Sequence, residues 1–161
     1  MDDDRSHHVW VAEPHEAETV ARLMVAFRNH LGRSWPSDNA FLAGIEGLLE
    51  LPDTEFLLGA PHDDAPPCGV AQLRFRHGLW RAGGDCLLED LFVTAQARWA
   101  GLGRALVRAS IDRARERGCR RVELDVSETN AAALHLYATV GFTVPPPGDR
   151  DLYLRLHLDS G

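Results

Sequence analysis

The run from Cys86 to Val126 constrains the fold of this chain more than any other part of the sequence. It opens with CLLEDLFV, whose apolar residues predict a strand, and closes with CRRVELDV, which predicts another. Between them, GLGRALVRASIDRARERG places Leu102, Leu106 and Ala109 on one helical face and ends at Gly118. The run therefore predicts a strand, a glycine-containing loop, a helix and a second strand in direct succession.

The rest of the chain adds further helices and strands around this run. Apolar residues at helical spacing predict helices over 16–32, over 38–51 with Asp38 as the N-cap, and over 130–142. Short apolar or alternating segments predict the remaining strands, at 8–14, 55–60, 68–76 and 151–158, with a further short strand at 142–144.

This succession predicts an α/β protein built on a single mixed sheet. Six or seven strands, with helices on both faces of the sheet, accommodate all the segments. We expect one domain over 1–161, in which 1–7 form a disordered tail.

Composition and charge exclude several classes of function. The 161 residues carry a formal net charge of −7 and no long basic run, so we do not expect nucleic acid as a partner. The three cysteines are widely spaced and lack a CxxC pair, which predicts neither a disulfide framework nor a metal site. No apolar run approaches the roughly 20 residues of a membrane span. The N-terminus lacks an apolar signal core, and we therefore expect a cytoplasmic protein.

The loop before the long helix combines glycines with arginines. RWAGLG occupies 98–103, and Arg104 follows at the start of the helix. A helix N-terminus offers free N–H groups and partial positive charge, and glycine lets an anion approach the backbone. The loop therefore suits a pyrophosphate, although a purely structural glycine turn is the alternative. It is not a Walker loop, since no Lys-Ser/Thr pair follows, and it lacks the third glycine of a Rossmann fingerprint.

Two motifs carry a family resemblance. RWAGLG at 98–103 is followed, about one strand–helix step later, by NAAALHLYATVGF at 130–142. With LEDLFV before them, they make the chain resemble the GNAT superfamily of acyl-coenzyme A-dependent N-acetyltransferases over roughly Glu55 to Leu156. The resemblance implies acetyl-CoA as co-substrate, a mostly antiparallel sheet whose central parallel strands splay apart, and a homodimer. One departure is Trp99, where many members carry glycine, and we expect its side chain to point outward.

The resemblance also implies which residues bind the co-substrate. The backbone of Leu91, Phe92 and Val93 would bond the pantetheine arm like an added strand. The pyrophosphate would be held by the loop residues Arg98, Trp99, Ala100, Gly101, Leu102, Gly103 and Arg104. Asn130 and Tyr137 would contact the co-substrate from the second motif. As a general acid, the Tyr137 phenol would give the leaving sulfur a proton. The alternative for Tyr137 is an aromatic residue that only packs on the sheet.

Glu89 and Asp90 are the candidates for the base. A substrate amine arrives mostly as ammonium, because the pKa of an alkylamine is about 10, and a carboxylate can remove its proton. In polyamine-type members the strand resembling LEDLFV carries the base at the glutamate, which favours Glu89 and leaves Asp90 second, at the substrate. Adjacent strand residues point to opposite faces, so we expect only one to reach the acetyl group. Alternatively, both carboxylates cap the strand entrance or pair with arginines.

The acceptor is less well specified by the sequence. In this family the two N-terminal helices and their connection usually border the acceptor site, which implies Phe27, His30, Trp35 and Asp38 as neighbours of the substrate. Aromatic and acidic side chains favour an amine. We therefore predict acetyl transfer to a primary amine of a small molecule in a ternary complex. A protein lysine or N-terminal acetyltransferase, and a non-catalytic acyl-CoA-binding domain, are the alternatives.

Overall fold

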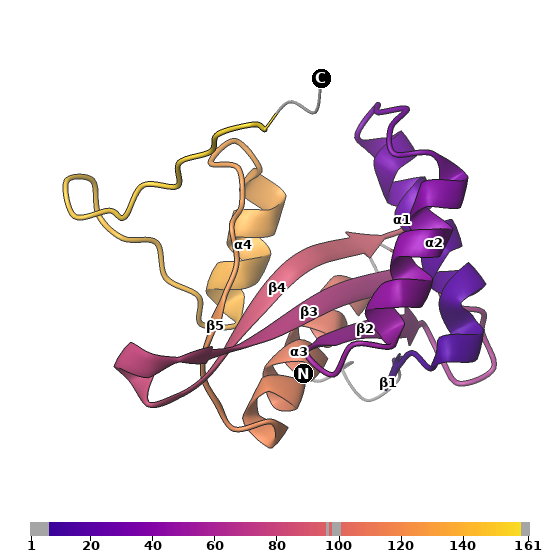
Figure 1. Cartoon of the computed structure of the whole chain (residues 1–161), viewed down its shortest axis with the longest axis horizontal. Coiled ribbons are helices and arrows are strands. Elements are labelled where there is room, and N and C mark those ends of the chain that lie inside the picture. The colour runs from indigo at the N-terminus through magenta and orange to yellow at the C-terminus, as the bar shows by residue number, and fades with distance from the viewer. Residues whose placement is uncertain (1–6, 96, 98–100, 159–161) are drawn as a thin grey trace. The chain divides into compact units, whose positions relative to one another are not determined.

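The computed structural model describes residues 7–95, 97 and 101–158 of the chain. The chain divides into two compact units, Met1–Ser127 and Glu128–Gly161. The elements, labelled in Figure 1, are β1 (His8–Val11), α1 (Ala17–His30), α2 (Asp38–Leu49), β2 (Thr54–Ala60), β3 (Gly69–Gly78), β4 (Gly83–Val93), α3 (Leu102–Glu116), β5 (Cys119–Glu123) and α4 (Ala131–Thr139). No helix in the described part of the chain has the length and apolar character needed to cross a bilayer.

The predicted strand–loop–helix–strand run is confirmed as β4, α3 and β5, within one mixed sheet. The strand order is β1-β2-β3-β4-β5, with antiparallel pairing up to β4. β4 and β5 are parallel, because α3 carries the chain back to the same end of the sheet. Their ladder ends at the pair Leu87 and Glu123, whereas β4 continues to Val93. In the described ranges, β5 thus leaves the last part of β4 uncovered.

Helices pack on both faces of this sheet, as predicted. On one face, Phe56, Val70 and Phe92 of three adjacent strands form a core with residues of α1 such as Leu23. On the other face, Leu106 of α3 is fully buried over β2 and β3. Figure 1 shows α1 and α2 over the end of the sheet at which β4 finishes, while the β3–β4 hairpin extends beyond them.

The approach of α3 to the sheet depends on two glycines. A Cβ atom on Gly69 would lie 2.8 Å from Cδ1 of Leu106, and one on Gly59 would lie 3.0 Å from Cδ1 of Leu102. A Cβ atom on Gly69 would force the buried Leu106 side chain to shift, and one on Gly59 would require Leu102 to move by a few tenths of an ångström, so glycine at these two positions lets the helix pack closely.

We expect Gly69→Ala to lower the free energy of unfolding by about 1–3 kcal/mol, the usual cost of overpacking a core. Gly44→Ala is the matched control. A Cβ atom on Gly44 meets nothing within 4 Å, and Gly44 lies inside α2. That substitution is expected to raise stability by up to about 1 kcal/mol, because alanine favours helices. Urea unfolding measures both, and equal stability of Gly69→Ala and the native protein would contradict the close contact.

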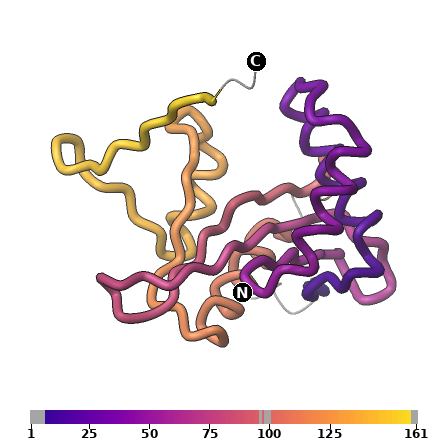
Figure 2. The backbone as a smooth tube through the Cα atoms, in the orientation of Figure 1, coloured from indigo at the N-terminus to yellow at the C-terminus, as the bar shows by residue number. Residues whose placement is uncertain are grey.

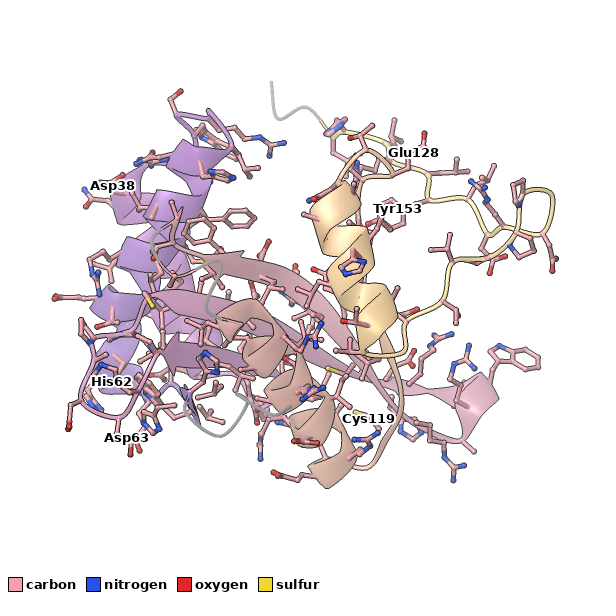
Figure 3. The ribbon with its side chains drawn as sticks, turned by 180° about the vertical axis from the view of Figure 1, so that it is seen from behind. Asp38, His62, Asp63, Cys119, Glu128 and Tyr153 are labelled. Carbon is pink, nitrogen blue, oxygen red and sulfur yellow. The ribbon has the colours of Figure 1, made fainter. Side chains whose placement is uncertain are left out.

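The second unit contains α4 and a long segment without strands. The predicted strands at 142–144 and 151–158 are wrong for this structure, because residues 142–158 form neither strand nor helix, and the sheet has five strands. Figure 2 follows this segment after α4. A strand forms only where a neighbouring strand can hydrogen-bond to its backbone N–H and C=O groups. Leu152 and Leu154 remain 79% and 86% exposed, and Tyr153, labelled in Figure 3, is 75% exposed.

The start of α2 corrects a smaller prediction. Ser37, not Asp38, is the N-cap, and its Oγ accepts a hydrogen bond from the Ala40 N–H at 3.2 Å. Asp38 is the first helical residue and pairs with Arg28 at 2.8 Å. Both residues suit a helix start, so the sequence located the cap to within one position. The predicted tail over 1–7 lies outside the described residues except for His7, whose Cε1 lies 3.5 Å from a Cβ atom placed on Gly101.

Candidate active site

The N-terminal end of α3 has the geometry of an anion site. Gly101 adopts φ 78°, a left-handed conformation that favours glycine, and precedes the helix directly. The first intrahelical hydrogen bond runs from the Ala105 N–H to the Gly101 carbonyl. The amides of the first turn before Ala105 are therefore directed out of the helix end. Leu102 is fully buried and anchors this end of the helix to the sheet. Gly103 and Arg104 are half-buried on the same turn.

Three of the predicted pyrophosphate residues, Arg98, Trp99 and Ala100, lie outside the described residues. The part that is described still fits an anionic co-substrate, because a helix N-terminus preceded by a left-handed glycine suits a phosphate group. Beside it, Leu91 to Val93 belong to the stretch of β4 that β5 leaves uncovered. Phe92 and Val93 are buried, so their backbone rather than their side chains could meet a ligand.

A β-bulge changes the orientation of the two acidic residues. Gln72 pairs with Asp90 and Leu73 pairs with Leu88, so Glu89 is an extra residue in β4. Asp90 lies on the same face of the sheet as its partner Gln72. Glu89 contacts Arg74, which is two residues after Gln72 in β3 and therefore lies on that face too. The expectation that adjacent carboxylates point to opposite faces is therefore wrong here.

The two carboxylates differ in their partners. The Arg74 Nε–H donates to Oε2 of Glu89 at 3.0 Å, and each of these side chains is 35% exposed. Within the described ranges no side chain donates a hydrogen bond to Asp90 or forms an ion pair with it. Burial raises the pKa of the Asp90 carboxyl to about 6, and the negative charges of Glu89 and Asp125 contribute to this.

Two of the predicted acceptor residues lie next to this face. The Phe27 ring stacks on Phe92 with centroids 5.1 Å apart, and the His30 ring lies 5.9 Å from the same ring. Phe92 is two residues after Asp90 on the same face of β4. Trp35 is 79% exposed on the connection between α1 and α2, and no hydrogen bond, ion pair or ring contact ties it to this face among the described residues.

The second sequence motif forms a complete capped helix. The Asn130 Oδ1 accepts a hydrogen bond from the Ala133 N–H at 3.2 Å and so caps α4. At the other end Gly141 has φ 105°, and the Phe142 N–H donates to the Tyr137 carbonyl at 3.0 Å. The rings of Tyr137 and Phe142 meet edge to face with centroids 5.7 Å apart. Burial raises the pKa of the Tyr137 hydroxyl above its usual value.

Sequence reasoning missed Gln72, Arg74 and Asp125 as neighbours of the acidic pair. Arg74 and Gln72 alternate with apolar residues in their strand, which marks one shared face. That signal does not say which residues of β4 lie opposite, because the register across a bulge depends on how two strands pair.

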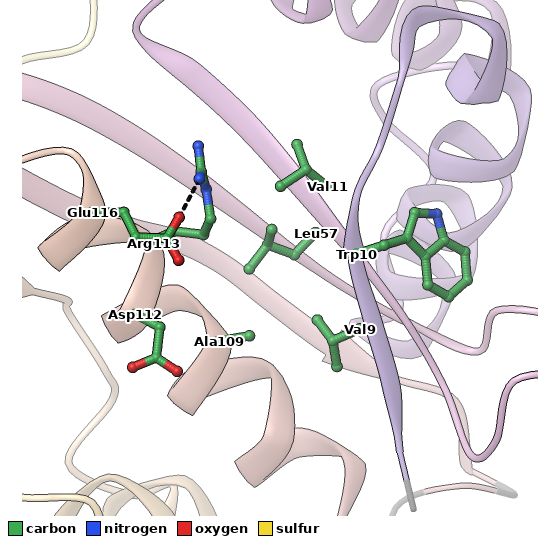
Figure 4. A pocket seen from close by; sticks show the side chains of 8 residues that line it. All are labelled: Val9, Trp10, Val11, Leu57, Ala109, Asp112, Arg113 and Glu116. Atoms are coloured by element: carbon green, nitrogen blue, oxygen red, sulfur yellow. Dashed lines mark hydrogen bonds and ion pairs between the residues drawn. The ribbon is translucent and has the colours of Figure 1, made fainter. Parts of the chain in front are cut away.

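The structure also contains a pocket of about 220 Å³ between β1 and the C-terminal half of α3. Figure 4 shows its lining side chains, which are Val9, Trp10, Val11, Leu57, Ala109, Asp112, Arg113 and Glu116. Arg113 is paired with Glu55 and Glu116. The pocket lies away from the helix N-terminus, and Asp112 and Glu116 would repel a diphosphate. We therefore do not assign it to the co-substrate.

The sequence model of the Acetyltransferase (GNAT) family matches residues 18–142, and the chain belongs to that family. The match spans both compact units. The resemblance inferred from the two motifs is thus confirmed.

Several known proteins are similar to this chain. The thialysine N-epsilon-acetyltransferase of Bos taurus is 30% identical over 87 residues, which cover 53% of this chain and 51% of that protein. The chain thus spans about half the length of this relative. Glucosamine 6-phosphate N-acetyltransferase 1 of Oryza sativa subsp. japonica is 32% identical, over 80% of this chain and 78% of that protein. A solved structure from Arthrobacter sp. FB24 has a TM-score of 0.80 and 30% identity, covering 94% of this chain and 95% of that one.

Proposed function

We propose that the protein is an N-acetyltransferase that moves an acetyl group from acetyl-CoA to a primary amine of a small molecule. The observation that carries this proposal is the acidic pair Glu89 and Asp90, which lies at a bulge beside the uncovered edge of β4. Family membership supports acetyl-CoA as the co-substrate. The relatives named above act, by their names, on thialysine and glucosamine 6-phosphate, both of which are amines. The family match across both units supports a single domain.

The backbone and the helix end would hold acetyl-CoA. Leu91 to Val93 would bond the pantetheine arm like an added strand, while Gly101 to Arg104, with the loop before them, would bind the pyrophosphate. A backbone N–H near Leu91 would hydrogen-bond the carbonyl oxygen of the thioester as negative charge develops on it. Asn130 already caps α4 with its Oδ1, so its contact with the co-substrate would use its amide nitrogen or its backbone.

The reaction needs one base and one acid. A carboxylate of the acidic pair removes a proton from the substrate ammonium, and the amine nitrogen attacks the thioester carbonyl directly. The carbon–nitrogen bond forms, the carbon–sulfur bond breaks, and sulfur leaves with its electron pair. The Tyr137 phenol gives the sulfur a proton and regains one from the nitrogen or solvent. No covalent enzyme intermediate is needed, and one proton is released overall.

The test is the release of free CoA thiol from acetyl-CoA in the presence of amines. We would supply thialysine, glucosamine 6-phosphate and pooled small amines separately, and a lysine-containing peptide pool in parallel. Amine-dependent release with a small molecule is the expected result. Release only with peptides would contradict the small-molecule part of the proposal. If calorimetry shows bound acetyl-CoA but no pool gives release, the small-molecule proposal is wrong, and the two alternatives left are a protein acceptor outside the pools and a non-catalytic acyl-CoA-binding domain.

A further inference from the structure

The bulge in β4 places two carboxylates of unequal character on one face of the sheet. Glu89 is the extra residue of the bulge, and one of its oxygens accepts the Arg74 Nε–H at 3.0 Å. Asp90 follows directly, lies opposite the buried side chain of Gln72, and is itself half-buried. Arg74 thus holds one oxygen of Glu89, whereas neither oxygen of Asp90 has a side-chain partner among the described residues.

Asp90 also lies at the boundary between the covered and open parts of this face. Beyond it along β4, Phe92 is buried under Phe27 of α1. On the other side, Arg74 and Glu89 are partly exposed. A substrate amine that enters where α1 stops covering the sheet would meet Asp90 next to the uncovered edge of β4. In the acetyl transfer proposed above, an acetyl group bound along that edge would lie close to this position.

The charges around Asp90 come from several elements. Glu89 on the same strand and Asp125, two residues after β5, are both negative and disfavour ionisation of Asp90. Arg74 of β3 is engaged by Glu89, and His30 of α1 lies against Phe92. Together with burial, the two acids raise the pKa of Asp90 to about 6.

This environment makes Asp90 a stronger base than an ordinary aspartate. With a pKa of about 6, it binds a proton roughly 10²-fold more tightly than a free aspartate, yet it is mostly ionised at pH 7. The equilibrium constant for proton transfer from an alkylammonium to Asp90 is then about 10⁻⁴, whereas it would be about 10⁻⁶ for an ordinary aspartate. General bases work best when their pKa lies close to the working pH.

We propose, on the basis of the acetyl transfer proposed above, that Asp90 rather than Glu89 takes the proton from the substrate ammonium. Glu89, held by Arg74, is then a positioning residue that keeps a negative charge beside Asp90. In the proton-transfer step the nitrogen–hydrogen bond of the ammonium breaks and Asp90 becomes a neutral carboxylic acid. Asp90 returns this proton to solvent after the amide has formed.

The deciding experiment is the pH dependence of kcat/KM for Asp90→Asn, Glu89→Gln and the native protein, with the small amine that gives turnover in the panel. In the native protein kcat/KM should rise through an apparent pKa of about 6 and then level off. Asp90→Asn should lose about 10²-fold at pH 7 and then gain about tenfold per pH unit up to the amine's own pKa, because only the free amine reacts. Glu89→Gln should keep the rise but shift it to lower pH, since a neighbouring negative charge is gone.

Two controls separate this role from other causes. Asp112→Asn replaces an exposed acid of α3 that pairs with Arg115, and it should leave kcat/KM unchanged. His30→Gln removes the imidazole that lies against Phe92, and the rise near pH 6 should persist in this variant. If the rise disappears with His30→Gln, the rise does not report on Asp90 and the proposal is wrong.

A stability measurement tests Asp90 without substrate. A carboxyl whose pKa is raised in the folded state destabilises the fold as the pH rises from about 4 to about 6. Asp90→Asn should therefore lower the unfolding equilibrium constant at pH 8, by up to about 10²-fold, and change little at pH 4. If Asp90→Asn does not fold, Asp90→Ser serves as the second variant in both experiments.

The outcomes distinguish this proposal from the proposed function. Turnover in the native protein that Asp90→Asn retains and Glu89→Gln abolishes would assign the base to Glu89 and overturn the inference alone. Acetyl-CoA binding without turnover by the native protein would overturn the acetyl transfer, and the role of Asp90 would fail with it. Slow turnover in Asp90→Asn that recovers with rising pH supports the inference, because a residue with a purely structural role would not give this recovery.

Discussion

Tyr137→Phe is expected to lower kcat by about 10²-fold or more, while the KM for acetyl-CoA changes little. A general acid contributes about 10² to 10⁴ to a reaction rate, and the phenol is the proposed proton donor for the leaving sulfur. Phenylalanine removes only the hydroxyl, so the edge-to-face contact with Phe142 at the end of α4 is kept. Burial raises the pKa of the Tyr137 hydroxyl, which therefore stays protonated throughout the neutral and mildly alkaline range.

The other tyrosine of the chain provides the matched control for this prediction. Tyr153 is 75% exposed and stacks with Arg155, so Tyr153→Phe should leave kcat unchanged. Tyr137→Ala would remove the ring as well as the hydroxyl, and it is expected to destabilise α4 in addition. The measurement is the steady-state rate of CoA thiol release at saturating amine. A kcat for Tyr137→Phe within twofold of the native value would show that the sulfur leaves without this proton.

Glu55→Gln is expected to lower the free energy of unfolding by about 2 kcal/mol at pH 7. The Glu55 carboxylate accepts hydrogen bonds from Nε of Arg113 at 2.9 Å and from Nη1 of Arg117 at 3.2 Å, and its side chain is only 11% exposed. Loss of one partner of a fully buried ion pair costs about 3–5 kcal/mol, and we place the cost lower because the two arginines retain contact with water. These three side chains hold α3, and the residue that follows it, against β2.

The pH dependence of this effect has a definite sign. Burial by itself raises the pKa of Glu55, but the hydrogen bonds and positive charges of Arg113 and Arg117 outweigh it and hold the pKa below its usual value. A carboxyl with a lowered pKa stabilises the fold above its unfolded-state pKa, and this contribution is lost as the pH falls through the folded-state value. Urea unfolding should therefore show a smaller difference between Glu55→Gln and the native protein at pH 3 than at pH 7.

Glu116→Gln is the control for Glu55→Gln. Glu116 pairs with the same Arg113, but it is 61% exposed, and exposed ion pairs contribute about 0–1 kcal/mol. We expect Glu116→Gln to lower the free energy of unfolding by less than half as much as Glu55→Gln does. Equal costs for the two substitutions would contradict the assigned role of burial at Glu55.

Much of the second motif could be understood from sequence because its signals are local. Asn130 caps α4, Gly141 takes the left-handed conformation that ends it, and Phe142 packs back on Tyr137. These contacts span one helix, so a pattern of residue types is enough to predict them. The same contacts give the motif a structural role that is independent of any contact with a co-substrate.

The alternating leucines after residue 150 show where a local pattern was insufficient. Leu152, Leu154 and Leu156 have the period of a strand, yet the structure leaves them exposed and without strand pairing. Alternation describes which side chains would share a face, but a strand forms only when a second strand supplies hydrogen bonds to its backbone. The sequence of the segment by itself contains no information about that partner.

The sequence by itself determined the succession of strands and helices up to α4, the glycine before α3, and the presence of two adjacent acids in β4. Only the tertiary structure decided that Glu89 and Asp90 share a face, and that Arg74 engages one of them and not the other. The physical reason is that strand alternation fixes side-chain direction only while the register is regular. A bulge shifts the register and so changes which side chains share a face. It is a property of two paired strands rather than of either strand alone.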